Sequence, residues 1–200
     1  MKYVKVLGLL AVAAAALMAF VATASATTAT SPKGTVYTGA LKGETEGATT
    51  LHGVVDITCN QAAVEGKVEQ HGSGTTAAGN ISSLTFSECG SNHVTVKTAG
   101  SLEAHATAVK GEDSDGTLTS TGAEVSIQIT SLSITCVYTT NNSDIGTGTL
   151  TSSTTTGGNA TIDVESTAIP RTGGSFFCGS SAEWTGSIRV VTPSTLYIDA

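Results

Sequence analysis

Four histidines are the side chains of this sequence best suited to acid–base chemistry or metal binding. They are His52, His71, His93 and His105, and each lies in or beside a segment whose pattern predicts a strand. None has a histidine partner four residues away, the spacing of a helical zinc-binding pair. The Gly-x-Ser-x-Gly motif of a serine nucleophile on a strand–turn–helix elbow is also missing. We therefore expect solvent-facing histidines and assign no catalytic residue.

The densest group of carboxylates occupies residues 112–116, with the sequence Glu-Asp-Ser-Asp-Gly. Alternating oxygen ligands of this kind can surround a calcium ion, but the glutamate that completes such a loop downstream is missing. A tight turn at Asp115-Gly116, leading into a strand at Thr117, explains the same residues. We therefore predict no metal ligand and no cofactor.

Aromatic side chains, which stack on sugars in glycosidases and carbohydrate-binding proteins, are scarce. Phe86, Phe176 and Trp184 stand close in sequence to cysteines, where a contribution to the core is the favoured interpretation. Sugar chemistry is accordingly disfavoured.

The N-terminal 26 residues have the three-part pattern of a secretory signal. Lys2 and Lys5 precede an uncharged apolar run over Val6–Val21, and Ala22–Ala26 contains small residues in the spacing that signal peptidase accepts. We predict a signal peptide over residues 1–26, a flexible leader over 27–34 and an all-β domain over 35–200. The expected location is secreted, with no membrane span after cleavage.

The predicted mature chain is acidic and rich in Thr, Ser, Gly and Val. Two of the nine basic residues leave with the signal, so seven face sixteen acidic residues, a net charge of −9. Negative charge disfavours binding to nucleic acids and to anionic membrane surfaces. The composition favours strands and turns over helices.

Four cysteines, all in the predicted mature chain, indicate two disulfides formed in an oxidising compartment. They are Cys59, Cys89, Cys136 and Cys178, and they allow three pairings. Loop-closure entropy favours the nearer partners, so we predict Cys59–Cys89 and Cys136–Cys178.

Alternation of apolar and polar residues recurs along the chain. It is clear in Val125, Ile127 and Ile129, in Leu132, Ile134 and Cys136, and around Trp184 and Ile188. Such alternation is typical of antiparallel sheets with one buried face. Turn signals separate about a dozen short strands, which predicts an all-β fold, a sandwich or barrel of Greek-key or meander topology.

An internal duplication is suggested by two stretches that align without gaps. Residues 39–59 match residues 116–136 at Gly39 and Gly116, at Leu41 and Leu118, and in the shared Ile-Thr-Cys, and Cys-Gly-Ser recurs at Cys89 and Cys178. The candidate repeats are 39–115 and 116–200. No Pro-rich or charged linker divides them, which favours one continuous domain.

Several motifs resemble those of a group of uncharacterised secreted β-rich proteins predicted from actinobacterial genomes. They are residues 83–89, 169–178, 182–186 and 193–197. The resemblance covers most of the predicted mature chain and implies export. It implies no activity, ligand or site residue.

These observations favour a non-enzymatic extracellular or cell-envelope module for binding, with its partner undefined. A cell-envelope component or another protein would suit such a surface module. A rigid β scaffold whose loops carry a site would serve this role. The alternatives are a secreted hydrolase with a loop-borne site and a structural or adhesive surface subunit.

Overall fold

The three-dimensional structure is a computed structural model of the 200-residue chain. It describes residues 27–69, 77–106, 115–140, 146–156, 158–166 and 168–199. Within these ranges antiparallel strands dominate, accompanied by one short helix, α2 (Ser153–Thr156), and one 3-10 turn (Thr130–Leu132). The predicted all-β class is confirmed. The predicted signal peptide lies outside the described residues.

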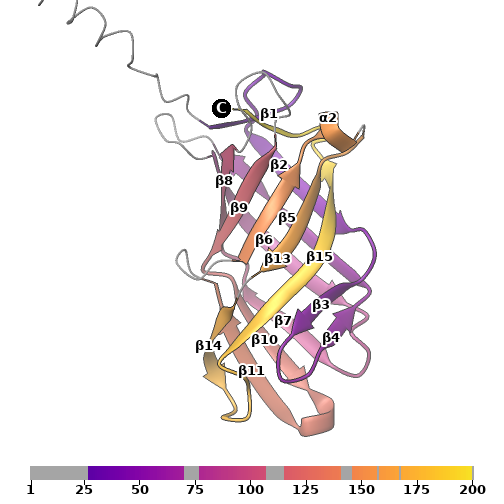
Figure 1. The fold of residues 1–200 in the computed structure, drawn as a ribbon, viewed down its shortest axis with the longest axis vertical. Coiled ribbons are helices and arrows are strands. Elements are labelled where there is room, and N and C mark those ends of the chain that lie inside the picture. The colour runs from indigo at the N-terminus through magenta and orange to yellow at the C-terminus, as the bar shows by residue number, and fades with distance from the viewer. Residues whose placement is uncertain are drawn as a thin grey trace, which may run out of the picture.

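Eight antiparallel strands close into a barrel (Figure 1). They are β2 (Gly39–Thr45), β5 (Gln61–Glu69), β6 (Ala77–Ser87), β8 (Ser101–Ala106), β9 (Gly116–Thr121), β12 (Gly146–Thr151), β13 (Thr161–Ser166) and β15 (Ser181–Thr192). Successive barrel strands are neighbours around the barrel, and β15 closes it by pairing with β13 on one edge and β2 on the other. Of the architectures left open by the sequence, the barrel with meander order is the one formed.

Six further strands, which we call the extension, prolong one end of the barrel. They are β3 (Thr49–His52), β4 (Ile57–Cys59), β7 (His93–Thr98), β10 (Glu124–Ile129), β11 (Ile134–Thr139) and β14 (Ile169–Gly174). The first half of β15 runs into the extension, where it pairs with β3 and β14, and β14 continues the sheet through β11 and β10 to β7. The molecule is therefore elongated along the barrel axis (Figure 1).

The other end of the barrel is covered by a two-stranded sheet of β1 (Thr28–Thr30) and β16 (Tyr197–Asp199). Ala29 and Ile198, facing partners in this sheet, are each only 2 % exposed. Part of the predicted leader 27–34 is thus a strand that closes the barrel. The prediction of a flexible leader was wrong for residues 28–30, because the distant C-terminal strand β16 pairs with them and the nearby Val36 and Tyr37 also bond to them.

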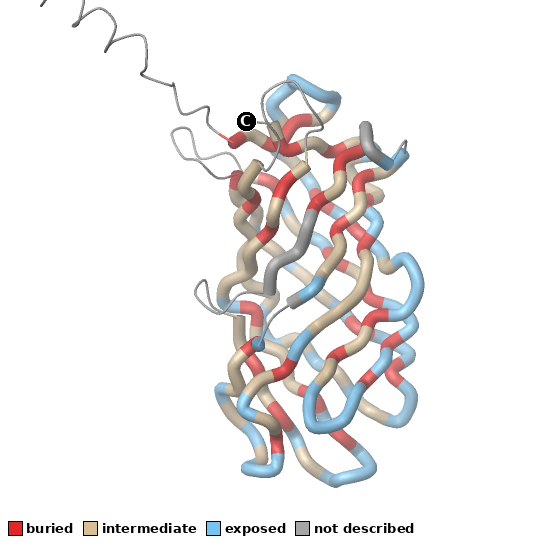
Figure 2. Tube along the Cα trace, viewed as in Figure 1, coloured by how far each residue is buried: buried red, intermediate tan, exposed pale blue. Residues whose placement is uncertain are grey.

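Most strands alternate as the sequence predicts, because they have one buried face (Figure 2). In β5, the buried Ala62, Val64 and Val68 are separated by residues such as Glu65 that face solvent. One stretch departs from the pattern. Leu132, expected to point inward with Ile134 and Cys136, instead lies in the 3-10 turn and is 47 % exposed.

The core consists of two clusters of buried side chains. The first fills the barrel and includes Leu41, Leu118 and Val190. The second fills the extension and includes Ile127 and all four cysteines. The side chains of Leu84 and Trp184 pack against both clusters, so the two regions share one continuous interior.

Both disulfides have the predicted pairing and lie in the second cluster. Cys59 is bonded to Cys89, and Cys136 to Cys178, with sequence separations of 30 and 42 residues. Two such bonds indicate folding in an oxidising environment.

The candidate repeats 39–115 and 116–200 each supply four barrel strands in chain order. In both halves, extension strands follow the first and the third of these barrel strands, and one disulfide joins residues of the same half. The duplication itself stays a prediction, with which this order of elements is compatible.

Gly100 lies where the chain passes from β7 of the extension into β8 of the barrel. Its φ is +74°, and a Cβ atom there would lie 2.4 Å from the carbonyl oxygen of Thr121 and 2.5 Å from the nitrogen of Ala123. Gly122, at the corresponding junction of β9 and β10, has a φ of +72° but open space around it. A substitution at Gly122 therefore tests backbone strain alone, and a substitution at Gly100 tests strain together with steric conflict.

We expect Gly100→Ala to lower the free energy of unfolding by at least about 2 kcal/mol, because both strain and a backbone collision apply. Gly122→Ala should cost about 1 kcal/mol, because strain alone applies. Urea unfolding of the two oxidised variants measures the difference. If both variants lost the same free energy of unfolding, the close approach at Gly100 would be contradicted.

Candidate functional site

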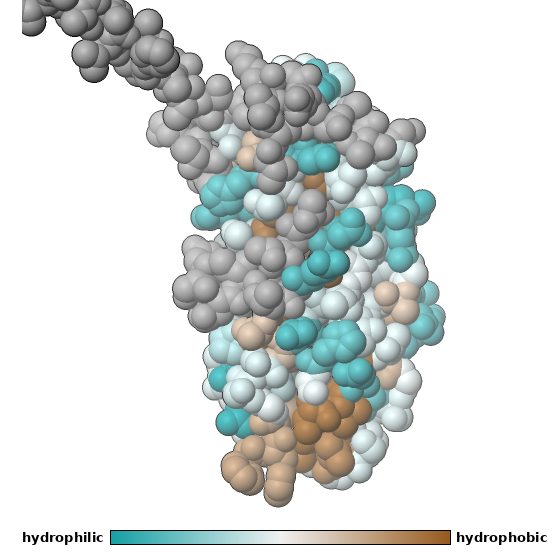
Figure 3. All heavy atoms as spheres, viewed as in Figure 1, coloured by the Kyte–Doolittle hydropathy of each residue, from teal (hydrophilic) through white to brown (hydrophobic). Residues whose placement is uncertain are grey.

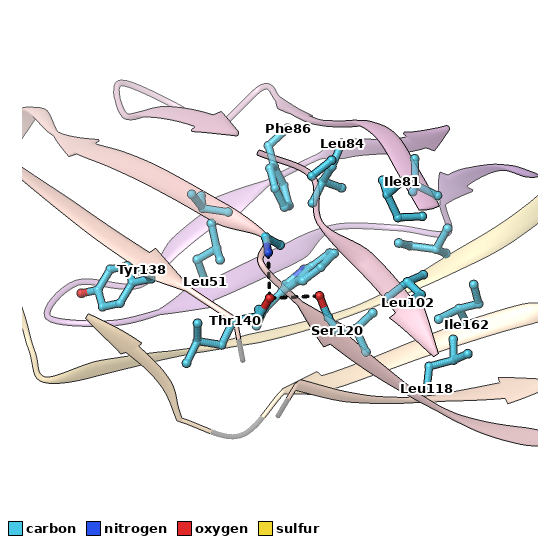
Figure 4. Close-up of a pocket in the computed structure, with 18 of the residues that line it drawn as sticks. Leu51, Ile81, Leu84, Phe86, Leu102, Leu118, Ser120, Tyr138, Thr140 and Ile162 are labelled. Atoms are coloured by element: carbon cyan, nitrogen blue, oxygen red, sulfur yellow. Dashed lines mark hydrogen bonds between the residues drawn. The ribbon is translucent and has the colours of Figure 1, made fainter. Parts of the chain in front are cut away.

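The interior is incompletely filled where the barrel meets the extension. A cavity of about 100 Å³ lies at this level (Figure 4). Its walls include Leu118 and Ile162 of the barrel core, Phe86 and Ile127 of the second cluster, and Trp184, which packs against both. The cavity is therefore the junction between the two cores.

Smaller hollows continue the cavity along the axis. One of about 40 Å³ lies toward the β1–β16 sheet and shares Leu118 and Ile162 with the main cavity. Another of about 10 Å³ lies toward the far end of the extension and shares Tyr138 and Ala182. An apolar interior thus extends through most of the molecule's length.

The size of the cavity follows from the number of strands. A barrel of eight strands is just wide enough for side chains to fill or for one small ligand to enter. An unfilled volume of this size costs about 2 kcal/mol of folding stability. Against a typical net stability of about 5–15 kcal/mol, that cost is substantial.

One polar position interrupts the apolar wall. The hydroxyls of Ser120 and Thr140 lie 3.1 Å apart and are hydrogen-bonded, and Thr140 Oγ1 also accepts a bond from the backbone nitrogen of Ala123 at 3.0 Å (Figure 4). Two hydroxyls joined by one bond retain one proton between them. That proton can be donated to an oxygen of a molecule inside the cavity.

Trp184 is held in place by contacts on two sides. Its ring meets Phe86 edge-to-face, with centroids 5.3 Å apart and an interplanar angle of 73°. Its indole nitrogen donates a hydrogen bond to Thr49 Oγ1, and that hydroxyl donates to the carbonyl of Thr185 at 2.9 Å. The predicted core role of Phe86 is confirmed, and Trp184 forms a fixed wall of the cavity.

Tyr138 lines the cavity on the extension side and is 4 % exposed. Burial raises the pKa of its phenol above the ordinary value of 10.0, and the positive charge of Arg171 partly opposes this shift. The phenol is therefore neutral throughout the physiological range, and it adds no charge to the cavity.

His52 takes part in a row of hydrogen-bonded side chains on the outer face of β3 and β15, in the extension. Its Nδ1 lies 3.1 Å from Asp56 Oδ1, and its Nε2 lies 3.1 Å from Thr185 Oγ1. The order carboxylate, imidazole, hydroxyl is that of a hydrolytic triad. A shallow groove of about 500 Å³ beside it is lined by Thr185 together with Asp163 and Glu165.

Two features make this outer chain a weak nucleophilic site. The side chains of His52 and Asp56 are 40 % and 66 % exposed, so solvent screens their interaction. Thr185 lies within β15 and pairs with Thr50 of β3 and Glu165 of β13. An oxyanion site needs free backbone N–H groups near the nucleophilic hydroxyl. Around Thr185 the backbone is instead engaged in strand pairing on both sides.

The other sequence-predicted candidates are scattered. His93 lies in β7 and His105 in β8, while His71 and residues 112–114 fall outside the described residues. Asp115 accepts a hydrogen bond from the backbone nitrogen of Ser152 at 2.6 Å. Within the described ranges no three His, Cys, Asp or Glu side chains form a metal-binding group.

Phe176 is the one predicted core aromatic that the structure places elsewhere. It is 83 % exposed, because the turn that carries it projects from the end of the extension. The cavity itself was missed by the sequence analysis. In the sequence its lining residues follow the ordinary alternation of inward-facing strand positions. Only the width of the closed barrel shows that they leave space between them.

No helix among the described residues has the length and apolar character needed to cross a membrane. Comparison of the chain with protein-family models, with curated proteins and with solved structures found no match.

We expect Tyr138→Phe to change how stability depends on alkaline pH. Because the folded pKa is raised, the unfolded chain releases its proton first, and the free energy of unfolding falls as the pH rises above about 10. The Phe variant lacks this contribution and should lose less stability over the same interval. Urea unfolding at a series of pH values tests this, and identical slopes in both proteins would contradict it.

Proposed function

We propose that this protein is a secreted, non-enzymatic binding module that holds a small amphiphilic molecule in the cavity between its two cores. The supporting observation is an apolar cavity with a single hydroxyl pair, Ser120 and Thr140, in its wall. The predicted signal peptide and the two disulfides support its placement outside the cytoplasm.

The composition of the cavity wall defines the class of ligand. Water needs about two to four polar partners to occupy a cavity, whereas dry apolar cavities on the order of 150 Å³ bind benzene-sized molecules. The main cavity, at about 100 Å³, is smaller than that, so it suits a short alkyl chain, and a longer chain would follow the hollows along the axis. The hydroxyl pair suits one ligand oxygen.

Retention of the cavity also favours a binding role. Larger side chains at its walls would fill the space and recover the stability that the cavity costs. Small residues such as Ala99, Ala123 and Ala182 instead line it. A cavity that lowers folding stability is expected to be retained where a ligand occupies it.

Bromohexanol, an amphiphile whose bromine quenches indole fluorescence on contact, tests the proposal through the protein's one tryptophan, Trp184. We expect saturable quenching and a rise in melting temperature, because the ligand binds the folded state only. Ala182→Phe should reduce the quenching at least about tenfold, because it places a ring in the cavity.

The matched control is Thr58→Phe, which adds the same ring at an exposed position of β4. Bromohexanol should quench the fluorescence of this variant as strongly as that of the unchanged protein. Linear, non-saturating quenching in all three proteins would show collisions with solvent-accessible indole and would overturn the proposal.

The alternative of a secreted hydrolase is favoured by one observation, the Asp56–His52–Thr185 chain. A nucleophilic Thr185 would make ester hydrolysis depend on both His52 and Thr185.

We expect hydrolysis of p-nitrophenyl acetate by the unchanged protein, by His52→Gln and by Thr185→Val to proceed at the same background rate. The exposed chain lacks the desolvation and free backbone donors that acyl transfer needs. A loss of 100-fold or more in both variants, on the order seen for catalytic groups, would instead establish the hydrolase.

A further inference from the structure

Exposed large apolar side chains gather at the end of the extension. Of the six in the described part of the chain, five lie there, and we call these five the apolar tip: Val54, Val55, Leu132, Phe176 and Phe177. Figure 3 shows apolar side chains concentrated at this end of the molecule. The sixth, Val36, lies at the opposite end, bridged to Thr30 of β1.

Three turns contribute to the tip, and two of them are joined through β11. Leu132 lies in the turn between β10 and β11, and the turn with both phenylalanines joins β14 to β15. The disulfide Cys136–Cys178 and a 2.8 Å bond from Ser175 N to the carbonyl of Thr135 tie this second turn to β11.

Val54 and Val55 come from the turn between β3 and β4. They line the small hollow at this end together with Ile129 and Cys136 of the neighbouring strands. All five side chains therefore lie around one end of the second core.

The phenylalanine turn displays its side chains through an internally bonded backbone. Arg171 Nη1 donates to the carbonyl oxygens of Ser175 at 2.9 Å, Phe176 at 3.3 Å and Cys178 at 2.9 Å. The backbone nitrogens of Phe177 and Cys178 donate to the Oγ and carbonyl oxygen of Ser175, respectively. Phe176 and Phe177 are nevertheless 83 % and 70 % exposed.

This bonding bears on what can cover the tip. Several backbone polar groups of this turn are already paired, and paired groups can enter an apolar medium without the cost of leaving a donor or acceptor unbonded. The guanidinium of Arg171 is itself directed into the turn. Insertion of the two rings would therefore remove apolar surface from water at little polar cost.

The charge around the tip points to an uncharged surface. Residues 125–140 and 172–182 contain no Asp, Glu, Lys or Arg. The charged residues that border the phenylalanine turn and Val55 have opposite signs: Arg171, whose guanidinium bonds within the turn, and Asp56, which lies 3.1 Å from His52 Nδ1. These two charges balance, although the whole chain has a net charge of −7. The argument from net charge that disfavours membrane surfaces applies to anionic lipid, and a zwitterionic surface carries no such penalty.

A second copy of the chain is a poor occupant. Stable protein interfaces bury roughly 1,200–2,000 Å² and usually have a polar rim. Five side chains on three separate turns offer only a small projecting surface. Aromatic and aliphatic groups that project singly suit the boundary between lipid headgroups and acyl chains.

We propose that the apolar tip docks this protein on uncharged, zwitterionic lipid surfaces, with Phe176 and Phe177 inserted among the headgroups. The small hollow lined by Val54 and Val55 places the docked end next to the apolar interior. Docking itself does not require that the cavity hold a ligand.

Co-sedimentation of the full oxidised protein with phosphatidylcholine vesicles tests this proposal. We expect measurable binding that falls at least about tenfold in the double variant Phe176→Ser, Phe177→Ser, because two exposed rings no longer leave water. The double variant Phe176→Leu, Phe177→Leu should retain most of the binding. Adding phosphatidylglycerol to the vesicles should weaken it.

Two controls separate docking from other effects. Val36→Ser removes an exposed apolar side chain from the opposite end and should leave vesicle binding unchanged. Ala182→Phe blocks the cavity and should also leave it unchanged, so failure of the ligand proposal remains distinguishable. Circular dichroism melting shows that each variant is folded.

Three results would overturn the proposal. They are no binding to phosphatidylcholine vesicles, equal binding of the serine double variant, and a wild-type dimer that becomes monomeric in that variant in sedimentation equilibrium. The last result would assign the tip to a second copy of the chain.

Discussion

Closure of the hydrogen-bonded ladder through β15 is the constraint on which the rest of the structure depends. This twelve-residue strand pairs with β13 and β2 to complete the barrel, and its first half pairs with β3 and β14 to begin the extension. Because an open sheet edge exposes unpaired donors and acceptors, closure removes that cost from the barrel. It also joins both ends of the molecule through one continuous element.

The cavity and the tip are two consequences of this arrangement. The barrel and the extension have separate cores that meet at Trp184 and Leu84, and the side chains of barrel and extension strands leave a space at that level. Beyond the extension the strands end in turns, where apolar residues have no layer to cover them. The proposed ligand site and the proposed docking surface lie along one axis. Together they suit a protein that takes up an apolar molecule at a lipid surface.

Agreement between sequence and structure is closest where a local pattern has one physical outcome. Alternation in β5 reproduced its buried face, and loop-closure entropy selected both disulfides. The pattern failed at Leu132, which continues the alternation but lies in a turn, and at Phe176, whose neighbouring cysteine is buried while its own ring is not. In both places the chain reverses at the end of a sheet, and no local feature marks where the sheet stops.

The sequence by itself determined the all-β class, the cysteine pairs and the acidic balance of the chain, because these follow from side-chain alternation, loop length and composition. Only the tertiary structure decided that the sheet closes into a barrel, that residues 28–30 cover its end, and that wall residues as far apart as Leu41 and Ile188 enclose a space. Closure, covering and enclosed volume depend on contacts between distant strands, and no single stretch of the chain specifies those contacts.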